Sequence, residues 1–193
     1  MATIHHPPTL INAYLSEKLN ELFYSGTPGT ITTPTVPLFP SMPTDIDALT
    51  ETFPYSDGRF AVYDRMFKMR RKAFPYIKSE QLLYYFYAYG ERAVPDIIEI
   101  AQIIQDFLDD GDQSAKEVNY WVKTKLNANG LFPVGADFVK PVYFHDIKIF
   151  QLEETRDIME IGTARTYAGN KVIVDYTYHK NYPGQDSDPT RPF

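Results

Sequence analysis

The sequence predicts an α+β fold, in which a mainly antiparallel sheet is flanked by helices and accompanied by an extended, Pro-rich arm. Three observations lead to this fold class. In some stretches apolar residues recur every three or four positions, the period of a helix face, and in others they alternate with polar residues, the period of a half-buried strand. In addition, eight of the fifteen prolines fall within residues 1–54. We expect residues 1–193 to form a single domain.

The first expected helix spans residues 10–23. Its apolar residues recur at spacings of four, four and three along one face: Ile11, Leu15, Leu19 and Leu22. Thr9 is the expected N-cap, because a threonine hydroxyl can accept a hydrogen bond from the first turn of the backbone.

The arm, residues 25–54, follows this helix. Its 25–43 part is rich in Pro, Thr and Gly, and proline removes the backbone donors that a central strand needs. Because this part also holds apolar side chains such as Phe39, we expect it to become ordered only against a neighbouring subunit, as we do for the C-terminal tail, residues 183–193. The alternative is an ordinary surface loop.

Residues 60–89 predict a long hairpin. Its first half leads into residues 65–72, here called the basic ribbon, whose five cations are Arg65, Lys68, Arg70, Arg71 and Lys72. Its second half, residues 76–88, is an aromatic-rich strand. We expect Tyr85 and Tyr87 of this strand, with Phe39 of the arm, at a subunit interface, because aromatic side chains are enriched at interfaces.

Two helices, or one helix kinked at Gly111, are expected next. Pro95 suits the first turn of the first helix, residues 97–110. Ser114 and Glu117 have the spacing of a capping box, which places the start of the second helix at Ser114. Residues 91–117, here called the acidic helix region, hold eight carboxylates and two cations, a net charge of −6.

The C-terminal part predicts a second strand pair, residues 144–152 and 171–180. In the first strand, Ile147 and Ile149 are expected on one face and Phe144, Phe150 and Leu152 on the other. In the second strand, one face is expected to hold the apolar and aromatic residues Val172, Val174, Tyr176 and Tyr178. Residues 168–170 are expected to form a turn or a bulge.

No catalytic or cofactor motif is present, so we expect no enzyme activity, no cofactor and no catalytic metal. The chain has no cysteine, which excludes disulfides and thiolate chemistry. His145 and His179 would meet across the predicted sheet, and a metal site there is the alternative to a structural pair. The acidic run Asp106, Asp109, Asp110 and Asp112 lacks the ligand order of a calcium loop.

Composition and charge limit the partners and the compartment that we expect for the protein. The formal net charge of −6 argues against nucleic acid as the main partner. No apolar run reaches the roughly 18 residues that a membrane-spanning helix requires. The N-terminus has no secretory signal pattern. We therefore expect a cytosol-like compartment, or a particle assembled there.

The basic ribbon has two readings. Its cations could contact phosphates while the following aromatic residues stack on bases, as in single-strand binders. Alternatively, the ribbon of one subunit docks on the acidic helix region of the next. A head-to-tail contact of this kind closes into a ring when the rotation between subunits allows it.

The order of helix, hairpin, helix pair and hairpin resembles the tail terminator, or tail completion, proteins of contractile-tailed bacteriophages. The residues that carry the resemblance are DRMFKMRRKAFPYIKSEQLLYYFYA (64–88), the acidic helix IIEIAQIIQDFLDD (97–110) and the strand pair within 144–180. The resemblance covers residues 9–180, and the Pro-rich arm and the tail are departures from the small members of that family.

The resemblance implies a structural virion protein that is not an enzyme. Members form hexameric rings that cap the tail tube and join it to the neck, so the implied partners are further copies of the chain, the tail tube, the tail sheath and neck or connector proteins. DNA would be only passing cargo in the channel, no membrane is involved, and assembly would occur in the host cytoplasm. A head-completion or connector protein, a nucleic-acid-binding module using residues 65–72, and a small hydrolase are the alternatives.

Overall fold

The computed structural model describes residues 6–24, 33–45, 47–66, 77–128, 142–160 and 166–180. Nine elements follow one another in this part of the chain: α1 (Pro7–Phe23), β1 (Leu38–Phe39), α2 (Asp47–Thr52), β2 (Phe60–Met66), β3 (Lys78–Tyr89), α3 (Ala93–Leu108), α4 (Gly111–Ala128), β4 (Val142–Glu160) and β5 (Thr166–Lys180).

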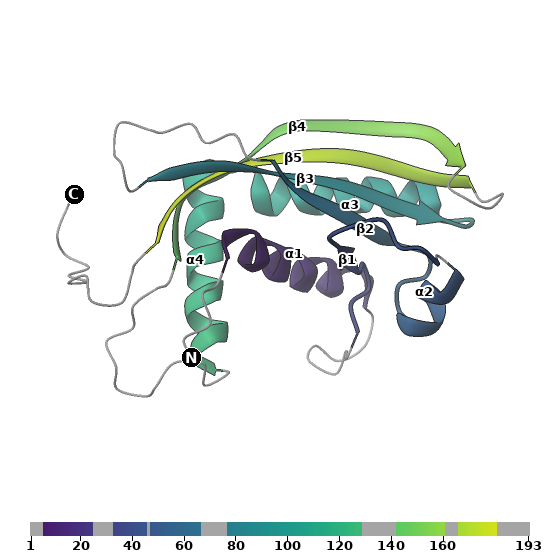
Figure 1. The fold of residues 1–193 in the computed structure, drawn as a ribbon, viewed down its shortest axis with the longest axis horizontal. Helices are drawn as coiled ribbons and strands as arrows, with labels where there is room; N and C mark the ends of the chain where they lie inside the picture. Colours follow the sequence, from purple (N-terminus) through teal and green to yellow (C-terminus); the bar gives the residue numbers. More distant parts are fainter. Residues whose placement is uncertain are drawn as a thin grey trace.

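The strands form one sheet in the order β1-β2-β3-β5-β4. Every neighbouring pair is antiparallel except β1 and β2, which are parallel. Helices α1 and α3 lie on the same side of this sheet, and α4 runs across the strand direction near one end of it (Figure 1). The predicted α+β class and both predicted hairpins are therefore confirmed.

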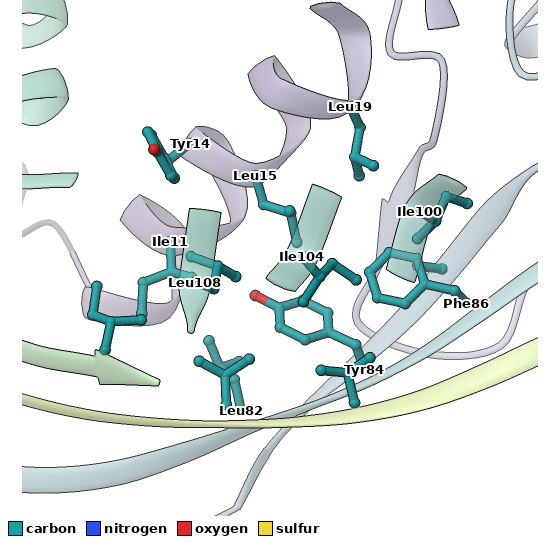
Figure 2. Packing of buried hydrophobic residues seen from close by; sticks show 14 of the residues in the cluster. Ile11, Tyr14, Leu15, Leu19, Leu82, Tyr84, Phe86, Ile100, Ile104 and Leu108 are labelled. Carbon is teal, nitrogen blue, oxygen red and sulfur yellow. The ribbon is translucent and has the colours of Figure 1, made fainter. Parts of the chain in front are cut away.

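The main core lies between the sheet and these helices. Alternate residues of β3 and β5 point toward it, as their period of two predicts. Ile11 and Leu15 of α1 and Ile104 of α3 pack near Leu82 and Tyr84 of β3 (Figure 2). Each of these side chains is at most about 3% exposed, and burial of one large apolar side chain contributes roughly 1.5–3 kcal/mol.

A second, smaller cluster lies on the opposite side of the strands, here called the outer face. Leu49 of α2, Phe60 of β2 and Tyr167 of β5 form its buried centre. Phe60 stacks on Tyr87 with ring centroids 5.0 Å apart, and Tyr167 meets the edge of the Phe60 ring at 5.9 Å. This cluster covers part of the outer face with the chain's own residues.

Residues 35–39 of the arm pack against their own chain. Thr35 and Val36 are fully buried, and β1 pairs with β2. The Thr35 hydroxyl donates to the backbone oxygen of Leu19 at 3.2 Å, and its backbone N–H donates to Oδ1 of Asn20 at 2.8 Å. The arm therefore binds the last turns of α1 in the same chain, because those turns offer unpaired acceptors. Residues 25–32 and 183–193 lie outside the described residues.

Both predicted helix caps were wrong. Helix α1 begins at Pro7, with prolines at its first two positions, so Thr9 lies inside the helix. Helix α4 begins at Gly111, so Ser114 is also internal, and its hydroxyl accepts a hydrogen bond from the Asp110 backbone N–H at 3.0 Å. The first residues of these two helices are set by Pro7 and Pro8 in α1 and by the left-handed Gly111 in α4, and not by the hydroxyl groups of Thr9 and Ser114.

Helices α3 and α4 are two separate helices. Only Asp109 and Asp110 lie between them, and Gly111 has a φ of 47°, a left-handed value that favours glycine. A Cβ added at Gly111 would lie 2.9 Å from Oδ1 of Asp146. The absence of a side chain at Gly111 therefore also leaves room for the Asp146 side chain of β4.

Strand β4 departs from regular alternation. Its register with β5 shifts between Phe144 and Asp146 and again between Ile149 and Gln151. Each extra residue moves the following side chains to the other face. The core face therefore holds Phe144 and Leu152 together with Ile147 and Ile149, and the predicted split of these residues between two faces was wrong.

The irregularities lie in β4 and not at residues 168–170, where a turn or bulge was predicted. Ala168, Gly169 and Asn170 pair in continuous register with Ala88, Tyr87 and Phe86 of β3. A third register shift lies opposite them in β4, between Thr155 and Met159. The glycine is accommodated within β5 as an ordinary ladder position.

Side chains from the helices contact the outer edge of β4. Asn119 of α4 donates its side-chain N–H to the Phe144 oxygen at 2.7 Å and accepts the Phe144 backbone N–H at 3.0 Å. Oδ1 of Asp109 accepts the backbone N–H of Ile149 at 3.0 Å. Backbone groups that face away from β5 are thus satisfied by side chains.

A buried ion pair connects the turn before β2 with α3 and lies against the end of α1. Nη1 of Arg59 lies 2.9 Å from Oδ2 of Asp96, and their side chains are 7% and 3% exposed. Arg59 also donates to the Tyr55 backbone oxygen at 3.1 Å and lies 4.2 Å from the centre of the Phe23 ring. Asp96 accepts a further hydrogen bond from Arg92 at 3.3 Å.

Replacing Asp96 with Ala should destabilise the protein by about 3–5 kcal/mol, because it leaves the buried Arg59 guanidinium with only the exposed Asp57 carboxylate, 3.7 Å away, as a counter-charge. The matched control is Glu99→Ala, which removes an exposed partner of Arg92 and should cost only about 0–1 kcal/mol. Urea unfolding followed by circular dichroism measures both values. Equal effects of the two substitutions would contradict the assigned role of Asp96.

Candidate functional site

Of the five cations in the basic ribbon, only Arg65 lies within the described residues. Arg65 lies in β2, where its backbone pairs with Leu82. Lys68, Arg70, Arg71 and Lys72 lie outside the described residues. The basic ribbon as an interface therefore stays a prediction.

The aromatic interface candidates lie on the outer face or beside it. Tyr85 is 37% exposed on that face. Tyr87 and Phe39 are only partly buried, and each packs against the smaller core cluster. Phe39 meets the edge of the Phe53 ring at 5.8 Å. Tyr85 thus presents the most surface of the three, while Phe39 and Tyr87 already contact residues of their own chain.

Strands β4 and β5 add further groups to the outer face. Phe150 is 61% exposed, because the bulge beside it turns its side chain away from the core. Lys171 and Glu153 pair across the two strands at 3.6 Å. Nε2 of Gln81 donates to Oδ1 of Asp175 at 2.5 Å. The face is therefore a mixture of aromatic and charged groups.

His145 and His179 meet across β4 and β5, as their strand positions suggested. Nε2 of His145 lies 2.8 Å from Nδ1 of His179, and the ring of Tyr143 lies 5.2 and 5.4 Å from the two imidazoles. One nitrogen must donate and the other accept, so the contact requires at least one unprotonated nitrogen. Within the described residues, no group of three or more His, Asp or Glu side chains is placed to hold a metal ion.

A buried carboxylate that the sequence did not single out lies on the core side of β3. Glu80 is 1% exposed and accepts hydrogen bonds from the hydroxyls of Tyr176 and Tyr178, each at 2.8 Å. Two phenol donors compensate for the loss of hydration of the carboxylate. We assign this group a structural role, because its partners belong to the predicted core face of β5.

A groove lies between α1, the end of α3, and α4. Its volume is about 540 Å³, within the range of roughly 300–1,000 Å³ that is typical of ligand pockets. We call it the aromatic groove, and nine residues line it: Tyr14, Lys18, Phe107, Gln113, Lys116, Glu117, Tyr120, Trp121 and Thr124.

Aromatic rings form the walls of this groove. Tyr14 meets Phe107 at 6.3 Å and Trp121 at 5.8 Å between ring centroids, both edge to face. Tyr14 leaves α1 on the side away from Leu82, whereas Leu15 points toward the strands (Figure 2). Tyr120 is 73% exposed at the rim. Trp121 is the only tryptophan of the sequence.

The two lysines of the aromatic groove are already paired. Nζ of Lys18 lies 2.8 Å from Glu21 and 5.0 Å from the centre of the Phe107 ring. Nζ of Lys116 lies 2.5 Å from Asp112. Lys18 shows that a cation can be held over these ring faces.

One carboxylate of the groove lacks a cationic partner in the described part of the chain. Glu117 accepts hydrogen bonds from the Tyr14 hydroxyl at 3.3 Å and from Gln113 at 3.1 Å. Burial of Tyr14, followed by the negative charge of Glu117, raises the pKa of the Tyr14 hydroxyl. The groove therefore retains a negative charge beside apolar rings.

More unpaired negative charge lies next to the groove, at the end of α3. Across the described residues, Asp106, Asp109 and Asp110 form no ion pair, and the last turn of α3 holds no basic residue. The partial negative charge of a helix C-terminus adds to these carboxylates. Asp96 and Asp112, by contrast, are neutralised within the chain.

The groove leaves little mark in the sequence, because Trp121 has the spacing of the apolar stripe that Val118 and Val122 form in α4. Val118 and Val122 do occupy that stripe, at 0% and 1% exposure, but Trp121 is only partly buried and turns toward Tyr14. The available signal was weak, since Tyr14 and Lys18 sit beside the apolar face of α1 at a spacing of four.

Comparisons with known proteins add no assignment. No protein-family model matches the chain, and no curated protein matches it. Among the described helices, none is both long and apolar enough to cross a membrane.

The raised pKa of Tyr14 predicts a loss of stability in alkali. Its contribution is complete below the ordinary tyrosine pKa of 10.0 and declines above it, because the unfolded chain then releases this proton while the folded chain retains it. Tyr14→Phe should cost about 0.5–1.5 kcal/mol at neutral pH, and this deficit should shrink as the pH rises past 10. Urea unfolding of both proteins across this range measures the difference. A deficit that stays constant with pH would contradict the prediction.

Proposed function

We propose that the chain is a structural virion protein, a tail terminator that forms a ring, caps the tail tube and joins the tail to the neck. The observation that carries this proposal is the order of the elements in one sheet: a helix, an antiparallel hairpin, a helix pair and a second antiparallel hairpin. This is the order on which the resemblance to tail terminator proteins rests.

Two unlike sides of the subunit support a head-to-tail ring. The helical side carries the acidic helix region and the aromatic groove, and the outer face carries Tyr85, Phe150 and the paired histidines. Contacts between unlike surfaces generate rings when the rotation closes. The proposed ring contains roughly six copies, the number that the resemblance implies.

The proposed action is geometric. A ring that matches the end of the tail tube would stop addition of further tube subunits and offer a docking surface to the neck. Opposite charges on the basic ribbon and the acidic helix region would speed encounter and fix orientation. Because exposed ion pairs contribute only about 0–1 kcal/mol each, apolar burial must supply most of the cohesion.

The proposal is tested by the mass of the purified protein, alone and mixed with tail tubes. Sedimentation velocity should find a closed oligomer of roughly six copies in at least one of these conditions. A chain that remains monomeric in both would contradict the tail terminator assignment. Tight binding of single-stranded nucleic acid by that monomer would favour the nucleic-acid-binding alternative.

Reversing two charges of the ribbon tests its part in assembly. Arg70→Glu combined with Arg71→Glu should slow ring formation and make it more sensitive to salt, because steering by opposite charge is lost. The control is Lys123→Glu with Lys148→Glu, which changes the net charge equally at exposed sites on α4 and β4.

Sedimentation at low and high salt, with circular dichroism as the folding check, compares the two double variants. Assembly that is unchanged in the ribbon variant would remove the basic ribbon from the interface. Equal slowing in both variants would attribute the effect to net charge alone.

A further inference from the structure

We propose that the aromatic groove binds the basic segment of residues 67–76 of a second copy of the chain. This inference rests on the proposed ring and deepens it, because it names the two surfaces that meet. The groove supplies rings, one uncompensated carboxylate and flanking acidic residues. The segment supplies four cations, Lys68, Arg70, Arg71 and Lys72, with Phe67 before them and Phe74 and Tyr76 after them.

Charge selects this occupant among the segments outside the described residues. Residues 67–76 carry four cations and no carboxylate. Residues 129–141 balance Asp137 with Lys140, and residues 181–193 hold Asp186 and Asp188 against Arg191. Residues 1–5, 25–32 and 46 hold no lysine or arginine, and residues 161–165 hold Arg165 alone. The carboxylates at the end of α3 therefore attract residues 67–76 more strongly than any other segment outside the described residues.

The groove also fits the chemistry of the segment. An arginine or lysine is attracted to the face of an aromatic ring, and Lys18 already lies 5.0 Å from the Phe107 ring centre. Glu117 offers a carboxylate to a second cation, since no cation among the described residues pairs with it. Phe67, Phe74 and Tyr76 can cover the exposed ring of Tyr120.

The fluorescence of Trp121 can report on binding in the aromatic groove. It lines the groove and is the only tryptophan of the chain, so its fluorescence reports on this site alone. A synthetic peptide of residues 65–76 contains no tryptophan and adds no signal of its own at the tryptophan excitation edge. The receptor is the full chain with Arg70→Glu and Arg71→Glu, whose own segment is disabled.

Addition of this peptide should shift or quench the Trp121 emission in a saturable way. A peptide with Gln in place of Lys68, Arg70, Arg71 and Lys72 should have no such effect. Tyr120→Ala in the receptor should weaken binding roughly threefold to tenfold, the range expected for one aromatic contact. Phe150→Ala, which removes a similarly exposed ring from the outer face, should leave binding unchanged.

Two results separate this inference from the proposed ring. In the wild type, the Trp121 emission should change with protein concentration in step with oligomer formation. If a ring forms but the Trp121 emission ignores both the peptide and oligomer formation, the groove contact is overturned and the ring stands. If the peptide binds but the wild type is monomeric, with emission independent of concentration, both the second-copy contact and the ring are overturned.

Equal effects of the charged and the Gln peptides would also overturn the proposal, because the argument for this occupant depends on charge. Tyr120→Ala leaves the fold intact in our expectation, since its side chain is 73% exposed. Circular dichroism of each variant checks this directly. Glu117→Gln provides a second groove variant, and it should weaken the charged peptide while leaving the aromatic walls in place.

Discussion

The buried ion pair between Arg59 and Asp96 is the interaction on which the placement of the other elements depends. It joins the turn before β2 to the first turn of α3, and the Arg59 guanidinium also covers the Phe23 ring at the end of α1. The turn itself requires Gly58, whose φ is 80° and whose missing Cβ leaves room for the Tyr89 backbone. The further partners of this pair, Asp57 for Arg59 and Arg92 for Asp96, are both exposed, so the buried contact is the one that holds the turn against α3.

The two sides of the subunit carry different groups. Helices α1 and α3 cover one side of the sheet (Figure 1). The groove that they form with α4 holds aromatic rings and the Glu117 carboxylate. Among the described residues, α2 and the arm cover only part of the other side of the sheet, where Tyr85 and Phe150 are exposed. In the proposed ring, unlike surfaces would meet at every contact, so the segregation of charge within one chain would bear on assembly.

Periodicity predicted the elements well, because the buried faces of α1, α3 and β5 follow regular spacings of apolar residues. It could not predict the faces of β4, since a bulge inserts a residue without leaving a distinct mark in the sequence. The pairing of His145 with His179 was anticipated from strand position. The aromatic groove was not, because it is built by Tyr14, Phe107 and Trp121 from three helices whose relative placement depends on long-range contacts.

The exposed edge of strand β4 is interrupted by side chains from α4 and the α3–α4 turn and by shifts in its own register. This strand is nineteen residues long and lies at the margin of the sheet, where a bare ladder would invite another chain to add a strand, and then another. Asn119 occupies both backbone groups of Phe144, and Asp109 accepts the N–H of Ile149. Register shifts after Phe144 and after Ile149 break the repeat that an incoming strand must match. Strand addition along this stretch of β4 is thereby disfavoured, and copies of the proposed ring would associate through side-chain surfaces, which can saturate at a fixed number of copies.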